Sequence, residues 1–225
     1  MNIDHSNHFT KNKENVVTEI TYNSLKEFTN AISYKGELYD IFSTEYIFRG
    51  MSSSNYELLP NALRKENENS LWMFSGIKKS TDTKINNKWQ KFLEYRILKK
   101  FYCECDKNRL PLPINYTIRN TIFCNDLIGE EEAICENWLP HDFYEITALA
   151  QHYGLPTRLL DWSKNKYIAL YFAAIDNLNK KKTDDYIVLW ALNFSSAVNM
   201  SICPLEIINP AYYNNPNLGA QQGVF

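Results

Sequence analysis

The chain has 225 residues, of which 44% are hydrophobic and 22% charged, so it can bury a sizeable apolar core and has the composition of an ordinary globular protein. Its 24 basic and 26 acidic residues give a net charge of −2, which excludes a general electrostatic attraction to nucleic acid or to an anionic membrane. No apolar run has the length of a signal peptide or a membrane span, so we expect a cytoplasmic protein without a membrane partner.

The five cysteines give no sign of a cross-linked or metal-binding protein. Their number is odd, and none of them shows the paired C-x-x-C spacing of a structural zinc site. We therefore expect reduced thiols and no metal site.

The first 20 residues are polar and predict a poorly ordered tail, which leaves 21–225 as a single domain. Apolar periodicity and capping residues then predict alternating helices and strands. In chain order these are a helix over 25–32 capped by Ser24 with Glu27, a strand over 46–48 ending at Arg49-Gly50, a loop over 64–88, a helix over 89–105, a helix over 142–153 capped by Asp142, a short strand at 159–160, a buried helix over 167–175 and a central strand over 186–192. This pattern predicts an α+β fold, with a mixed sheet of short strands packed with several helices.

The segment ALAQHYGLPTRLLDWS, residues 148–163, concentrates polar side chains between two apolar helices. Gly154 stands where a helix ends in a left-handed residue, so the first helix should stop there. The polar side chains at the ends of the two helices are Gln151, His152, Asp161 and Ser163.

Two of the six arginines, Arg49 and Arg158, lie in this segment and at the Arg-Gly step. A guanidinium can hold a phosphate or carboxylate through two parallel hydrogen bonds, and Gly50 permits a close approach to the backbone. The start of a helix near Ser163 also favours an anion. We therefore expect a site for a phosphate-bearing small molecule.

Each of these features also has a structural interpretation. Arg158 and Asp161 are three residues apart and suit a structural ion pair. His152 suits a helix C-terminus, where the dipole favours its cation, and Asp161 or Ser163 suits a helix cap. Arg49-Gly50 also suits a strand end followed by a turn.

Four motifs follow one another along the chain: YIFRG at 46–50, AQHYGLPTRLLDWS at 150–163, YIALYFA at 167–173 and AQQGVF at 220–225. In these motifs and their order the chain resembles the FRG domain of bacterial and phage proteins. The family pattern continues beyond the last of these motifs. Two expectations stay open: the chain is a fragment of a longer protein, or it is a naturally shortened member.

The order of features is also similar to the ADP-ribosyltransferase fold, in which an arginine on an early strand holds NAD. This similarity implies that Arg49 binds the phosphates of NAD, that His152 or Tyr153 contacts its ribose or amide, and that Ser163 supports Arg49. It identifies no catalytic glutamate, because Gln221 and Gln222 stand at the comparable place. The predicted catalytic residues are Arg49, His152 and Asp161, and the predicted ligand-binding residues are Gly50, Gln151, Tyr153, Thr157, Arg158, Ser163 and Gln221.

Three functions are compatible with these residues. The first is an NAD-using toxin or phage-defence effector that acts on a protein or nucleic-acid target and is controlled by a cognate antitoxin or partner protein. The second is a non-catalytic module that senses a nucleotide or another anionic ligand. The third is a hydrolase in which His152 is the base and Asp161 orients it, which requires the two side chains to be within hydrogen-bond reach.

Overall fold

The computed structural model of the protein describes residues 10–11, 17–39, 42, 45–79, 86–113, 116, 118–120, 138–180, 186–195, 206–211 and 219–225. Contacts divide the chain into two compact units, Met1–Tyr46 and Ile47–Phe225. The predicted division into a tail and one domain stays a prediction. None of the helices in the described ranges combines the length and the apolar character that crossing a membrane requires.

The first unit contains a two-stranded ribbon and one short helix. Strand β1 (Thr10–Lys11) pairs antiparallel with β2 (Thr18–Glu19). Helix α1 (Leu25–Ile32) has the predicted bounds, and the Ser24 hydroxyl accepts a hydrogen bond from the backbone N–H of Glu27 at 3.2 Å. The predicted amino-terminal cap is confirmed.

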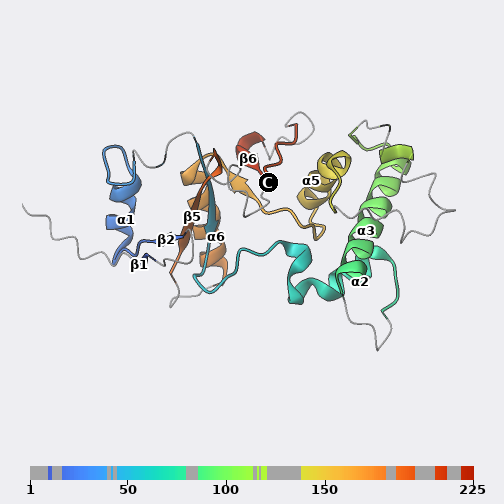
Figure 1. Ribbon diagram of the computed structural model, residues 1–225, viewed down its shortest axis with the longest axis horizontal. Helices are drawn as coiled ribbons and strands as arrows, with labels where there is room; N and C mark the ends of the chain where they lie inside the picture. The colour runs from blue at the N-terminus through green and yellow to red at the C-terminus, as the bar shows by residue number, and fades with distance from the viewer. Residues whose placement is uncertain are drawn as a thin grey trace, which may run out of the picture. The chain divides into compact units, whose positions relative to one another are not determined.

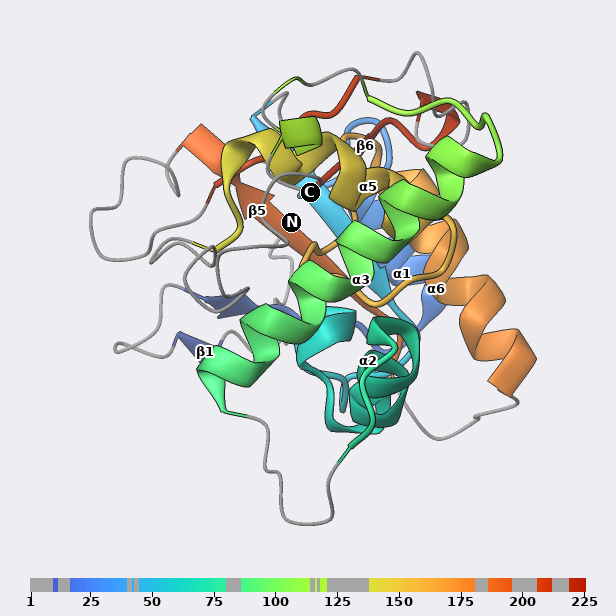
Figure 2. The ribbon, with the colours of Figure 1, turned by 90° about the vertical axis from the view of Figure 1, so that its right-hand side faces the viewer.

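The second unit contains most of the helices. They are, in chain order, the 3-10 turns η1 (Asn61–Leu63) and η2 (Lys65–Asn67), the helices α2 (Glu68–Ser75) and α3 (Asn87–Lys107), the 3-10 turn η3 (His141–Phe143), and the helices α5 (Tyr144–His152) and α6 (Lys166–Lys180). Figures 1 and 2 show α2 and α5 beside the long helix α3.

Helix α2 contradicts the loop predicted over 64–88. Its Leu71 and Trp72 are buried in one apolar cluster with Leu93 and Ile97 of α3. This packing stabilises a segment whose polar composition alone argues against regular structure.

Helix α5 follows a 3-10 turn and has no side-chain cap, so the cap predicted at Asp142 is wrong. The turn replaces it, because the backbone N–H of Phe143 donates to the carbonyl of Pro140. Gly154 has φ of +82° and its N–H donates to the carbonyl of Gln151, which confirms the left-handed residue predicted after this helix.

The second unit also holds a four-stranded sheet, apart from Tyr46, the first residue of one strand. Its strands are β3 (Tyr46–Met51), β4 (Trp162–Ser163), β5 (Val188–Asn193) and β6 (Gly223–Val224), in the order β5-β3-β4-β6. Strand β4 pairs antiparallel with both β3 and β6. Helices packed with this small sheet confirm the predicted α+β class.

Three details of the sheet differ from the prediction. Strand β5 is at the edge of the four-stranded sheet and not in its centre. The short strand expected at 159–160 lies instead at Trp162–Ser163. Strand β3 does not end at Arg49-Gly50 but continues to Met51. Gly50 is not part of a turn; its lack of a Cβ makes room for α6.

Helix α6 crosses β3 at Gly50. A Cβ at this position would lie 1.9 Å from the carbonyl oxygen of Ala169, so only glycine fits. Ala169 and Ala173 are buried, whereas Tyr171 and Phe172 are 61% and 45% exposed. The burial predicted all round 167–175 is therefore wrong, because only the small side chains of α6 face the sheet.

Candidate functional site

Arg49 is the most buried cation of the predicted site, with a side chain that is 16% exposed. Its Nη1 donates to the backbone carbonyl of Asp161 at 2.6 Å and lies 3.7 Å from Oδ2 of the same residue. Its Nε is buried and has no hydrogen-bond partner among the described residues. The guanidinium is thus only partly satisfied, which is unusual for a buried donor.

The electrostatic surroundings of Arg49 also disfavour its charge. Burial lowers its pKa below the ordinary value, Asp161 opposes this shift, and the positive charge of Arg64 adds to it. Since a buried charge is costly when it is incompletely paired, an additional anion at this place would be favourable.

Arg64 was not predicted as a site residue. It follows η1, and its Nε donates to the carbonyl of Leu59 at 2.9 Å. It lies near enough to Arg49 for its charge to act on the Arg49 guanidinium. The small number of arginines is the one feature of the sequence that could have pointed to Arg64. The polar segment around it is predicted to be a loop, which gave no reason to place it near Arg49.

A chain of polar contacts holds Asp161 opposite Arg49. The Gln151 amide donates from Nε2 to Oδ1 of Asp161 at 2.6 Å, and its Oε1 accepts from the Thr157 hydroxyl. The carbonyl of Thr157 in turn accepts from the backbone N–H of Ala62 at 2.9 Å. The structure therefore brings the predicted residues Arg49, Gln151, Thr157 and Asp161 together.

Arg158 does not pair with Asp161, so the predicted ion pair is wrong. Its Nε and Nη2 donate to the two carboxylate oxygens of Glu94 at 2.6 and 2.8 Å. Glu94 lies on α3, is 4% exposed, and also accepts from Gln90 and from the indole of Trp138. Sequence reasoning missed this carboxylate because it lies 64 residues away from Arg158 in the chain.

Ser163 connects β4 to the segment that precedes β6. Its hydroxyl donates to the carbonyl of Gln221 at 2.8 Å and accepts from the backbone N–H of Asn165 at 3.0 Å. Asn165 accepts from the N–H of Tyr167 at the start of α6, so Asn165 is the residue that caps this helix. The Ser163 hydroxyl thus holds backbone segments and does not contact Arg49.

His152 and Tyr153 lie at the exposed end of α5, with their rings 5.4 Å apart. The Tyr153 ring also lies 5.8 Å from Phe101 of α3. In contrast, both carboxylate oxygens of Asp161 are directed to other partners, Oδ1 to Gln151 and Oδ2 to Arg49.

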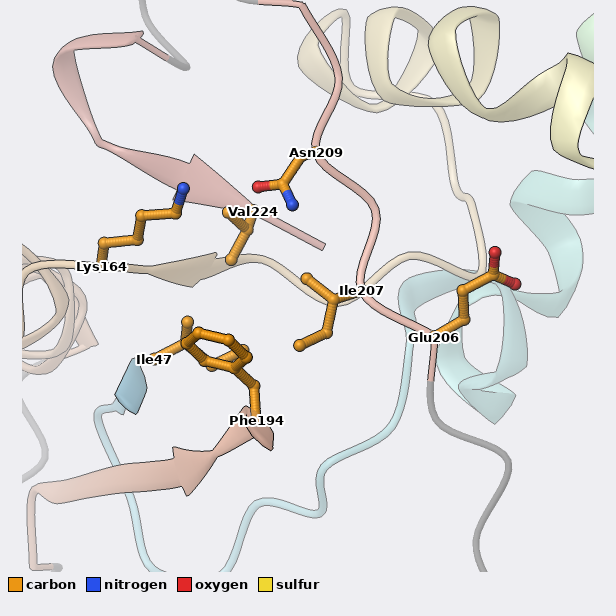
Figure 3. Close-up of a pocket in the computed structure, with 7 residues that line it drawn as sticks. All are labelled: Ile47, Lys164, Phe194, Glu206, Ile207, Asn209 and Val224. Atoms are coloured by element: carbon orange, nitrogen blue, oxygen red, sulfur yellow. The ribbon is translucent and has the colours of Figure 1, made fainter. Parts of the chain in front are cut away.

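A cavity of about 370 Å³ lies beside the sheet and is shown in Figure 3. We call it the sheet cavity. Its lining residues are Ile47, Lys164, Phe194, Glu206, Ile207, Asn209 and Val224. Side chains alternate along a strand, so Ile47 and Arg49 lie on one face of β3, and Phe48 and Gly50 lie on the face covered by α6. The cavity and Arg49 therefore share one face.

The carboxylate of Glu206 is directed out of the sheet cavity (Figure 3). Its Oε2 accepts from the Tyr144 hydroxyl at 2.5 Å, and its Oε1 lies 3.1 Å from Nδ1 of His141. Burial and this hydrogen bond raise the pKa of Tyr144 to about 12. Lys164 and Asn209 are thus the polar side chains of the lining that remain for a ligand.

Comparison with known proteins gives one match. The FRG domain family matches residues 118–182, a range that contains Gln151, Thr157, Arg158, Asp161 and Ser163. No curated protein and no solved structure matches the chain. The similarity to the ADP-ribosyltransferase fold therefore rests on the order of the sequence features alone.

Proposed function

The chain contains an FRG domain, and we propose that this domain binds a phosphate-bearing small molecule through Arg49, with NAD as the first candidate. The observation that carries this proposal is the buried guanidinium of Arg49, whose Nε has no partner among the described residues. A guanidinium with an unused donor can form a charge-assisted hydrogen bond to a phosphate oxygen.

The surroundings of Arg49 support an anionic ligand. The carboxylate of Asp161 is 61% exposed and lies 3.7 Å from Nη1, so this ion pair is long and open to solvent. A phosphate can displace this carboxylate or bind beside it, and Arg64 adds positive charge nearby. In either case the hydrogen bond from Gln151 to Oδ1 of Asp161 can remain.

We further propose an NAD-using effector with a role as a toxin or in phage defence. It would transfer ADP-ribose from NAD to a nucleophile of a protein or nucleic-acid target, so that the bond between the ribose and nicotinamide breaks and nicotinamide leaves. The order of Arg49, Ser163 and the apolar helix that follows supports this proposal by its resemblance to the transferase fold. Such an effector is expected to have a cognate antitoxin or partner protein. The reaction also needs a carboxylate at the bond that breaks, and Asp161 already pairs with Arg49 and Gln151.

A non-catalytic ligand-sensing module is the second candidate, and the same engagement of Asp161 favours it. With both oxygens of this carboxylate directed to other residues, the described part of the site holds a ligand more readily than it transforms one. The hydrolase stays a third prediction, in which His152 would be the base and Asp161 would orient it; in the structure Oδ1 of Asp161 accepts from Gln151 and Oδ2 lies 3.7 Å from Nη1 of Arg49.

The test compares ligand binding by the wild-type chain and by Arg49→Lys, using NAD, ADP-ribose and pyrophosphate in calorimetry and thermal-shift assays. A lysine keeps the positive charge but lacks the planar guanidinium with its several N–H donors. A hydrogen bond to a charged group contributes about 1.5–3 kcal/mol, so we expect the affinity for the ligand to fall at least tenfold. A ligand that binds only the folded state raises Tm, and this rise should shrink in the variant.

The matched control is Arg109→Lys, which makes the same exchange at an exposed arginine outside the site. Equal affinity of wild type and Arg49→Lys for all three ligands would refute the proposal. Consumption of NAD by the wild type, lost in Arg49→Lys, would select the transferase. Binding without turnover, with candidate targets present, would select the sensing module.

A further inference from the structure

The sheet cavity and Arg49 are connected by a row of paired residues. The pairing of Phe48 with Ser163 sets Arg49 opposite Trp162, and Trp162 pairs with Val224. Ile208 and Phe225 exchange two backbone hydrogen bonds, at 2.7 and 3.0 Å, which sets Asn209 opposite Val224. Side chains at directly opposed positions point to the same face.

This row fixes the spacing of the polar groups at its two ends. Neighbouring strands lie about 4.8 Å apart, so the backbones of Arg49 and Asn209 are about 14 Å apart, with Trp162 and Val224 between them. Inorganic phosphate is too small to contact both ends. A nucleotide is long enough to place its phosphate near one end and its base near the other.

The lining of the sheet cavity suits a planar heterocycle. Ile47, Phe194, Ile207 and Val224 offer apolar surface to the faces of a ring (Figure 3). Its volume of about 370 Å³ lies in the range of small-molecule sites. Asn209 offers both a donor and an acceptor, and an asparagine amide pairs in this way with the edge of adenine.

The charges around the sheet cavity agree with this ligand. Lys164 follows β4, lies opposite Ile47 of β3 and lines the sheet cavity, so the face that carries Arg49 holds a second cation. The Glu206 carboxylate, which would repel a phosphate, is held by Tyr144 and His141 away from the cavity.

We propose that the sheet cavity binds the base of an adenine nucleotide whose phosphate is held by Arg49, with Asn209 as the residue that recognises the adenine edge. This inference rests on the proposed function, since it names the ligand class of the same site. It assigns a specificity role to Asn209, which lies outside the FRG family match.

The experiment compares AMP with ribose 5-phosphate, which is the same molecule without the base. Calorimetry on the full chain should give at least fivefold tighter binding of AMP, as expected when a base stacks on apolar and aromatic side chains. Asn209→Ala should weaken AMP about three- to tenfold and leave ribose 5-phosphate unchanged. Asn87→Ala removes an exposed asparagine on α3 and should change neither.

A second variant, Ile207→Trp, fills the sheet cavity from one of its partly buried walls. It should abolish the preference for AMP while ribose 5-phosphate still binds, with folding checked by circular dichroism. If it does not fold, Asn209→Ala alone decides. Equal affinity for both ligands in the wild type, lost in Arg49→Lys, would overturn the base site and leave the phosphate site intact. Absence of binding for both ligands would overturn both proposals.

Discussion

The substitution Glu94→Gln tests whether the buried carboxylate on α3 organises the turn that carries Arg158. Glu94 is 4% exposed and accepts hydrogen bonds from Arg158, Gln90 and Trp138. Glutamine has nearly the same volume, so the substitution removes a charge without opening a cavity. It also replaces one acceptor oxygen by a donor, which then faces donors.

The expected cost follows from the burial of the pair. Removing one partner of a buried ion pair costs about 3–5 kcal/mol, because the other charge stays buried without compensation. The Arg158 side chain is 21% exposed and keeps some contact with water, so we expect about 3 kcal/mol. For a chain of this size, that lowers Tm by roughly 6–12 °C.

The assay is thermal and chemical denaturation of the wild type, Glu94→Gln, Glu94→Leu, Arg158→Leu and the Glu94→Leu/Arg158→Leu double variant. The double variant should be less destabilised than the two single-site changes together, since replacing both partners avoids an unpaired charge. The control is Glu104→Gln on the same helix, where the carboxylate is 54% exposed and pairs with Lys107, so stability should hardly change.

Two results would refute this reasoning. If Glu94→Gln is as stable as Glu104→Gln, the bidentate pair does not stabilise the fold. If Arg158→Leu keeps its stability but loses affinity for a phosphate ligand, Arg158 is a ligand-binding residue and not a structural one.

Three further predictions concern the elements around the site. Gly50→Ala should lower the free energy of unfolding by about 3 kcal/mol or more in denaturant titration, because a Cβ at this position has no room. The control Gly154→Ala has open space around its Cβ and should cost only about 1–2 kcal/mol, because of its positive φ. Equal costs would contradict the contact between Gly50 and α6. Ser163→Ala should cost about 1–3 kcal/mol, since it removes the donor to one part-buried backbone group and the acceptor of another. A loss below about 0.5 kcal/mol in the same titration would count against these bonds. The raised pKa of Tyr144 stabilises the fold below pH 10, and this contribution is lost as the pH rises to about 12. The Tm of Tyr144→Phe should therefore decrease less steeply with pH over this interval than the Tm of the wild type. Equal slopes would argue against the hydrogen bond from Tyr144 to Glu206.

The parts of the structure that the sequence predicted well depend on neighbours in the chain. The cap at Ser24 and the left-handed Gly154 were predicted correctly because each is decided by a few adjacent residues. The family resemblance also placed Gln151, Thr157 and Asp161 in one segment, and these three form a continuous set of hydrogen bonds. Short-range geometry is sufficient for such features.

The features that were missed depend on residues far apart in the sequence. The polar segment around α2 becomes helical because α3 buries its Leu71 and Trp72, which no local pattern reveals. Helix α6 looked buried all round, but β3 approaches it only along Ala169 and Ala173.

The candidate site divides in the same way. The sequence by itself determined which side chains are available at the ends of α5 and α6, and that Arg49 follows a β-rich run. Only the tertiary structure decided that Arg158 is committed to Glu94, that Arg49 keeps an unused donor, and that Asn209 completes a row across the sheet. The physical reason is that the role of a charged or amide side chain depends on the group with which it pairs. These partners come from distant parts of the sequence, and they meet only when the chain folds to bury its apolar surface.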